Sequence, residues 1–241
     1  MRYLAKTWKS RWSLFVIGAC GLLLLAVVVH AGHKETIEFE EANMIIEIND
    51  TDGDAGLQLK VDGTPWKKLK VTDTDGKKIL ELKAKGAIKK QGLTELFFES
   101  AEPPFGVFSL EDFLDRFPAG DYELEGQTVD GTKIVGTASL THDIPDAPVV
   151  TSPEDGDEVD PDDFTVTWDA VMTPGVEIVG YHVVVEKEDP LQVIHIDLPA
   201  SQTSVSIPPE FMQAETEYKV EVLAIEESGN QTITEVEFET E

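Results

Sequence analysis

The sequence predicts an all-β protein in which two β-sandwiches follow one another behind an N-terminal hydrophobic export segment. Three observations lead to this fold class. Beyond residue 35, apolar and polar residues alternate with a period of two, which is typical of strands with one buried face. Asx-Gly pairs and prolines separate these runs, as turns separate strands. A proline-rich stretch at residues 142–164 divides the strand pattern into two parts of about 100 residues, each large enough to bury a core of its own.

The first 31 residues have the layout of a secretory signal peptide. An apolar run of 16 residues, Leu14–Val29, precedes Ala31, after which we expect cleavage. The run is slightly longer than a signal core and slightly shorter than a membrane span, so an uncleaved signal anchor is the alternative. Its basic flank contains Arg2, Lys6, Lys9 and Arg11.

Both alternatives export the rest of the chain, to the periplasm, the cell surface or the medium. The membrane would be contacted only through residues 14–31 of an uncleaved, single-pass anchor. The only cysteine, Cys20, lies in this segment. The exported part therefore has no disulfide, although it enters an oxidising compartment, and its stability must come from its cores.

Charge is the strongest signal in the composition. The chain has 47 acidic and 19 basic residues and a formal net charge of −28. A negative field of this size repels nucleic acids and anionic lipid surfaces, which excludes both as partners. Residues 67–90 are the exception, because they contain nine lysines. Most of them alternate with apolar residues, as on the solvated face of strands; a docking patch for an acidic polymer or partner is the alternative.

Residues 35–144 are expected to form the first β-rich domain. Asp62-Gly63, Asp75-Gly76 and Asp130-Gly131 supply turn chemistry between its strands. The expected strands are MIIEI (44–48), LQLKV (57–61), KLKVT (68–72), ILELK (79–83) and LTELFFE (93–99), followed by a hairpin over residues 122–140.

One short helix interrupts these strands. Ser109 can cap it, and acidic residues follow in the first turn, where the helix dipole favours them. Pro118 ends it. Its apolar face is formed by Leu110, Phe113, Leu114 and Phe117, which recur at helical spacing and are expected to enter the core.

Residues 145–241 continue the strand pattern without a helix, as in a β-sandwich. Trp168 in TVTW, Tyr181 in IVGYHVVV, and Tyr218 and Gly229 in EYKVEVLAIEESGN carry a resemblance to the fibronectin type III family, as do the opening Pro145 and Pro148. Ala214 and Glu215 depart from its pattern just before Tyr218.

The resemblance implies a buried Trp168 and a corner tyrosine, Tyr218, whose hydroxyl bonds to nearby backbone. It also implies a secreted bacterial protein with this domain at its C-terminal end. Residues 35–144 end in a similar way, with FPAGDYELEG around Tyr122, so we expect an immunoglobulin-like or fibronectin type III-like sandwich there too.

The stretch NDTDGDAG, residues 49–56, is the clearest candidate for a metal site. Asp50, Asp52 and Asp54 stand at the first three ligand positions of a calcium loop. The required glycine and glutamate are replaced by Ala55 and Val61, which excludes an EF-hand. Two interpretations remain open: an acidic turn that binds no metal, or a calcium site of another kind. EDGDEVDPDD, residues 154–163, raises the same alternatives.

Signatures of catalysis are absent from the sequence. His33, His142, His182 and His195 are scattered without zinc-site spacing, and there is no nucleophile motif or phosphate loop. We interpret His182 and His195 as surface residues of the sandwich. Glu95, Glu99 and Glu102 could form a carboxylate cluster, although chance clusters are common in so acidic a chain.

These observations predict a non-catalytic, exported structural or interaction protein without a cofactor, whose partner is a protein or a polysaccharide. The alternative is an accessory module that binds carbohydrate or another extracellular polymer. That function needs aromatic rings in solvent, and Trp66 is its candidate.

Overall fold

The computed structural model describes residues 35–241, and these residues form one compact unit. The predicted export segment, residues 1–31, lies outside the described residues, so its cleavage or anchoring stays a prediction. Within residues 35–241, neither helix has the length and apolar composition that crossing a bilayer would require. Strands make up most of the structure, which confirms the all-β fold class.

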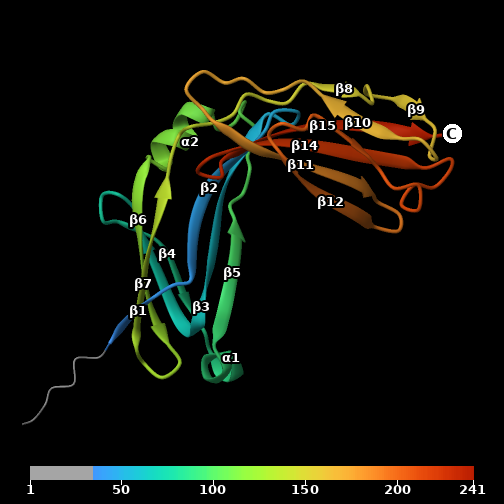
Figure 1. The fold of residues 1–241 in the computed structure, drawn as a ribbon. Helices are drawn as coiled ribbons and strands as arrows, with labels where there is room; N and C mark the ends of the chain where they lie inside the picture. The colour runs from blue at the N-terminus through green and yellow to red at the C-terminus, as the bar shows by residue number, and fades with distance from the viewer. Residues whose placement is uncertain (1–34) are drawn as a thin grey trace, which may run out of the picture. The chain divides into compact units, whose positions relative to one another are not determined.

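In the first half, two sheets share one long strand, β3 (Figure 1). Its beginning pairs with β2 on one side and β5 on the other, whereas its end pairs with β4 and β6. The strand β6 continues to β7, and β1 lies parallel to β7. The elements are β1 (Thr36–Glu38), β2 (Glu41–Asn49), β3 (Asp54–Thr72), β4 (Lys78–Lys83), α1 (Gly86–Gln91), β5 (Leu93–Glu99), α2 (Leu110–Arg116), β6 (Gly120–Thr128) and β7 (Lys133–Leu140).

The prediction of a turn at Asp62-Gly63 is wrong, because β3 continues through these two residues without reversing direction. Gly63 does not adopt the left-handed conformation found at Gly76 (φ 77°) and Gly131 (φ 97°), where the other two expected turns do occur. A side chain at Gly63 would crowd Phe39, since a Cβ there would lie 3.2 Å from its ring. The glycine therefore makes room for close packing at the irregular point where β3 leaves one sheet for the other.

The predicted short helix is confirmed as α2. Ser109 caps it by accepting a hydrogen bond from the Asp112 amide at 3.1 Å, and Phe113 is buried in the first core. Tyr122 is fully buried, and its hydroxyl donates to the Pro118 carbonyl at 3.0 Å. The helix α1, which contains Lys89 and Lys90, was not predicted from the sequence.

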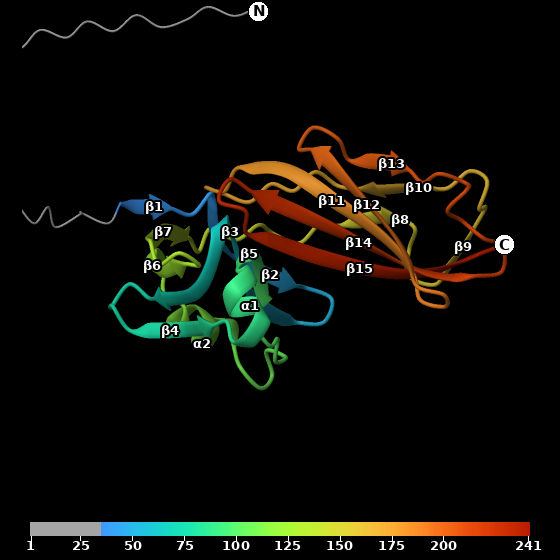
Figure 2. The same ribbon diagram turned by 90° about the horizontal axis from the view of Figure 1, so that it is seen from below.

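The second half is a sandwich of two sheets. One contains β8, β10 and β13, and the other contains β12, β11, β14 and β15 in that order, with β9 parallel to β15. Figure 2 shows β13, β10 and β8 as a layer beside β11, β14 and β15. The strands are β8 (Val150–Ser152), β9 (Asp157–Val159), β10 (Thr165–Trp168), β11 (Ile178–Lys187), β12 (Gln192–Pro199), β13 (Ser204–Ser206), β14 (Glu217–Glu226) and β15 (Gln231–Thr240).

The predicted core residues of this sandwich are buried. Trp168 meets Tyr181 edge to face with ring centroids 5.3 Å apart. The Tyr218 hydroxyl accepts from the Gln213 amide at 2.8 Å and donates to the Phe211 carbonyl at 3.3 Å, as a corner tyrosine should. At the position that departs from the family pattern, Glu215 takes a positive φ of 50°.

The proline-rich stretch, residues 142–164, packs against the second sandwich. Hydroxyls of β15 hold it, because Thr232 donates to the Pro145 carbonyl at 2.8 Å and Thr234 to the Pro148 carbonyl at 2.7 Å. The stretch also contributes β8 and β9 to the two sheets. Its backbone groups therefore find partners within the second sandwich.

The two halves have separate cores, and strand pairing joins them. β15 lies parallel to β2 over three residues, from Gln231 opposite Glu47 to Ile233 opposite Asn49, so the sheets of both halves form one hydrogen-bonded path. Leu223 and Ile233 belong to neither core, yet only 6% and 7% of their surface is exposed. Alternation along β14 and β15 places both on the face opposite the core of the second sandwich.

Candidate functional site

The stretch NDTDGDAG forms the turn between β2 and β3 and contacts the second half of the chain. Asn49 organises the turn, because its Oδ1 accepts from the amides of Thr51 at 3.0 Å and Asp52 at 3.1 Å. Its Nδ2 donates to Glu235 Oε1 on β15 at 2.7 Å. The Asp50 amide donates to the Ile233 carbonyl at 3.0 Å. The turn therefore has a structural role as a contact at the junction, which the sequence did not suggest.

The three aspartates of this turn do not come together as metal ligands. Among residues 35–241, no group of three ligand atoms lying within 4.8 Å of one another includes Asp50, Asp52 or Asp54. Burial raises the pKa of Asp54, and the charges of Asp52 and Glu235 raise it further. The acidic turn that binds no metal therefore stays the prediction, and calcium binding by these residues stays its untested alternative.

A different set of carboxylates gathers beside the turn. Glu47 on β2, Glu99 on β5 and Glu102 after β5 bring carboxylate oxygens within 4.8 Å of one another, whereas Glu95 is not part of the group. Burial raises the pKa of Glu102 to about 7, with further contributions from Glu99, Asp54, Glu47 and Asp52 in that order. Burial also raises the pKa of Glu47. Burial is therefore the main cause of both pKa shifts, and repulsion between neighbouring carboxylates adds to it.

Asn230, in the turn before β15, is the most buried polar contact of the junction. Its side chain is fully buried, and Oδ1 accepts from the Ile46 amide at 2.8 Å. Its Nδ2 donates to Thr141 Oγ1 at 2.8 Å and to the Asp143 carbonyl at 3.1 Å. The side chain of Asn230 thus bonds to β2 and to the segment after β7, while its backbone amide donates to Glu226 Oε1 at the end of β14.

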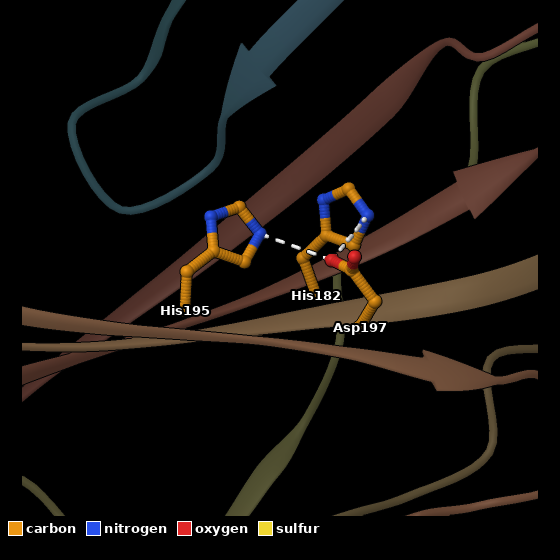
Figure 3. A group of neighbouring side chains, drawn as sticks. All are labelled: His182, His195 and Asp197. Atoms are coloured by element: carbon orange, nitrogen blue, oxygen red, sulfur yellow. Dashed lines mark ion pairs between the residues drawn. The ribbon is translucent and has the colours of Figure 1, made fainter.

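His182, His195 and Asp197 form the cluster with the most distinctive chemistry. Figure 3 shows the two imidazoles and the carboxylate together above β11 and β12. Asp197 lies directly opposite His182 in the register of these strands, and His195 is two residues before Asp197 on β12. Asp197 Oδ1 lies 3.2 Å from His182 Nε2 and 3.3 Å from His195 Nε2. The two rings pack edge to face with centroids 4.8 Å apart.

Strand geometry explains why the three side chains meet. Side chains alternate between the faces of a strand, so residues 195 and 197 share one face, and a residue opposite either of them shares it as well. The prediction that His182 and His195 are surface residues agrees with their partial exposure. The sequence did not predict that the two histidines lie close together. His195 and Asp197 share a face of β12, and His182 faces them from β11, but this requires the register of the two strands.

Trp66, the candidate sugar platform, is fully buried and packs edge to face against Phe39 at a centroid distance of 6.4 Å. Its Nε1 donates to the Thr94 carbonyl at 3.3 Å. Trp66 therefore has no ring face for a sugar to stack on and belongs to the core of the first half.

Residues 152–240 match the family model of the fibronectin type III domain. No protein with a curated description matches the chain. One similar solved structure, described as a myokine structure, is 27% identical, with a TM-score of 0.32, and the match covers 39% of this chain and 96% of that one. The fibronectin type III domain of the human collagen alpha-1(XX) chain is 20% identical, with a TM-score of 0.30, covering 40% and 82%.

A two-domain fibronectin type III segment of chicken tenascin is 12% identical, with a TM-score of 0.31, and the match covers 83% of this chain and 99% of that one. The family match, the two sheets of the second half and the corner at Tyr218 all concern the same part of the chain. Residues 152–240 therefore form a fibronectin type III domain.

Proposed function

We propose that the protein is an exported, non-catalytic structural or interaction protein of the cell envelope or the extracellular space. Fibronectin type III domains are common interaction modules, and this one occupies the C-terminal part of the chain. The layout of residues 1–31 supports export.

The junction between the two halves is the observation that carries this proposal. Asn230 is fully buried among partners from both halves, and β15 extends the sheet of the first half through β2. Breaking this junction would leave buried polar groups without partners, which is costly. The chain is therefore suited to hold two β-domains together as one unit, as a spacer or a two-part binding surface requires.

The charges on the surface of the protein indicate which kind of partner it binds. Two glutamates neutralise part of the lysine-rich face of the first half. Glu125 pairs with Lys70 at 2.6 Å and with Lys133 at 2.8 Å. Glu81 pairs with Lys78 at 2.6 Å and with Lys83 at 2.7 Å. Exposed pairs of this kind stabilise little, but they reduce the positive field that an acidic polymer would meet. A neutral or basic surface on a protein or a polysaccharide fits the strongly acidic chain better.

Cell fractionation with N-terminal sequencing tests the export part of the proposal. The chain should be found outside the cytoplasm, and the exported form should begin at Gly32 if the signal peptide is cleaved. A form that retains Met1 in the membrane fraction would indicate the anchor instead. Recovery of the chain in the cytoplasm alone would overturn the proposal.

Crosslinking in intact cells, followed by purification of the full chain, tests the interaction part. We expect a discrete set of crosslinked envelope components that an excess of unlabelled protein competes away. A chain that captures nothing specific under these conditions would contradict an interaction role. Turnover of an envelope polymer by the purified protein would contradict the non-catalytic role.

A further inference from the structure

We propose that His182, His195 and Asp197 form a binding site for a divalent transition metal ion of the zinc type. The proposal concerns the outer face of β11 and β12 and does not depend on the partner or the location of the protein. It rests on three features of the cluster: the chemistry of its donors, their spacing and the rigidity of the strands that carry them.

The donor set suits zinc better than it suits the hard cations. Zinc is bound in proteins by imidazole nitrogen and carboxylate oxygen, whereas calcium and magnesium prefer oxygen ligands throughout. The turn at residues 49–56 offers only carboxylates, so the two candidate sites differ in kind. The chain offers many carboxylates, but within residues 35–241 this is the one group of close ligand atoms that includes imidazole.

The spacing of the donor atoms agrees with one shared ion. Bonds of about 2.0–2.1 Å arranged tetrahedrally place neighbouring ligand atoms roughly 3.3–3.4 Å apart. The two distances from Asp197 Oδ1 to the histidine Nε2 atoms are 3.2 and 3.3 Å. An ion could therefore be bound with small side-chain adjustments, and the three donors leave a fourth position for water or for a ligand from a partner.

The site is carried by paired strands, which limits how far its donors can separate. β11 pairs with β12 on one side and with β14 on the other over most of its length.

Titration of the metal-free full chain with Zn²⁺, followed by calorimetry, tests the site. We expect one tight site above the weak binding that a strongly acidic surface gives to any divalent ion. His195→Gln and Asp197→Asn should each weaken that site at least tenfold. Two matched controls, His142→Gln and Asp146→Asn, should stay within twofold of the unchanged chain. His30 and His33, outside the described residues, are present in every variant and so cancel from the comparison.

Two further measurements separate a metal site from a hydrogen-bonded surface cluster. Mg²⁺ should reproduce the weak background but not the tight site, because magnesium avoids imidazole. Co²⁺ should develop the visible absorption of a low-coordinate nitrogen and oxygen site, and Asp197→Asn should abolish it. Equal Zn²⁺ affinity in the unchanged chain, His195→Gln and Asp197→Asn would overturn the proposal, as would tight binding lost only in a control. Export and partner binding can fail or succeed independently of these results.

Discussion

Replacing Asn230 by alanine should destabilise the protein by about 2–4 kcal/mol. The change removes the acceptor of the Ile46 amide, and a buried donor left without a partner costs about 1–3 kcal/mol. The carbonyl of Asp143 also loses its donor, which adds about 1 kcal/mol. Thr141 Oγ1 loses less, because it keeps its hydrogen bond with Ser228 Oγ at 2.7 Å.

Urea unfolding of the full chain measures this loss, and hydrogen exchange locates it. Exchange of the Ile46 amide should accelerate strongly, because opening of the junction then suffices to expose it. Asn43→Ala is the matched control: this asparagine lies on the same strand but is exposed, so its replacement should change stability by less than about 0.5 kcal/mol. A similarly small loss in Asn230→Ala would refute the idea that this side chain holds the junction together.

Three further predictions concern the cores and the acidic groups. Trp168→Ala should cost about 3–5 kcal/mol in urea unfolding, as for other buried aromatics, and a loss under about 1 kcal/mol would remove Trp168 from the core. The pKa of Glu102 is raised to about 7 in the folded state, so the protonated form of Glu102 favours folding. This stabilisation is fully present below about pH 4.5 and is lost as the pH rises through about 7. Solvent screening keeps the effect to about 1 kcal/mol or less, and Glu102→Gln should flatten that part of the stability profile; an unchanged profile would contradict the shift. Millimolar calcium and magnesium should raise the melting temperature by similar small amounts, with Asp52→Asn behaving like the unchanged chain, whereas a calcium-specific shift lost in that variant would establish a site.

Local sequence patterns predicted the strands and the buried aromatic residues of the second half well, because both depend on residues that are close together in the sequence. Alternation identified β5 to the residue, and the aromatic positions of the second half identified Trp168, Tyr181 and Tyr218 as buried. The fold class follows from these features, since alternating strands without long helices can bury their apolar faces only against another sheet.

The features that the sequence did not predict depend on contacts between distant segments. Asp62-Gly63 has turn chemistry, but β3 continues through it, and Gly63 packs closely against Phe39, which comes from a distant segment. The Asn49 turn resembles a calcium loop, yet its polar groups serve Ile233 and Glu235, which are far along the chain. The histidine–aspartate cluster could not be seen before the register of β11 and β12 was known, because a shift of one residue would move its members to opposite faces.

Because β2 pairs with β15, the sheet that joins the two halves can form only after the last strand has been synthesised. Ile46 and its acceptor on Asn230 are separated by 184 residues, so β2 is synthesised long before its neighbour. Until β15 arrives, β2 presents an open edge to which a strand of another molecule could add. We therefore expect products that end before Gln231 to aggregate even though the first half has all of its own core residues. Pairing of β15 covers this edge of β2 and so prevents strands of other copies of the protein from adding to it.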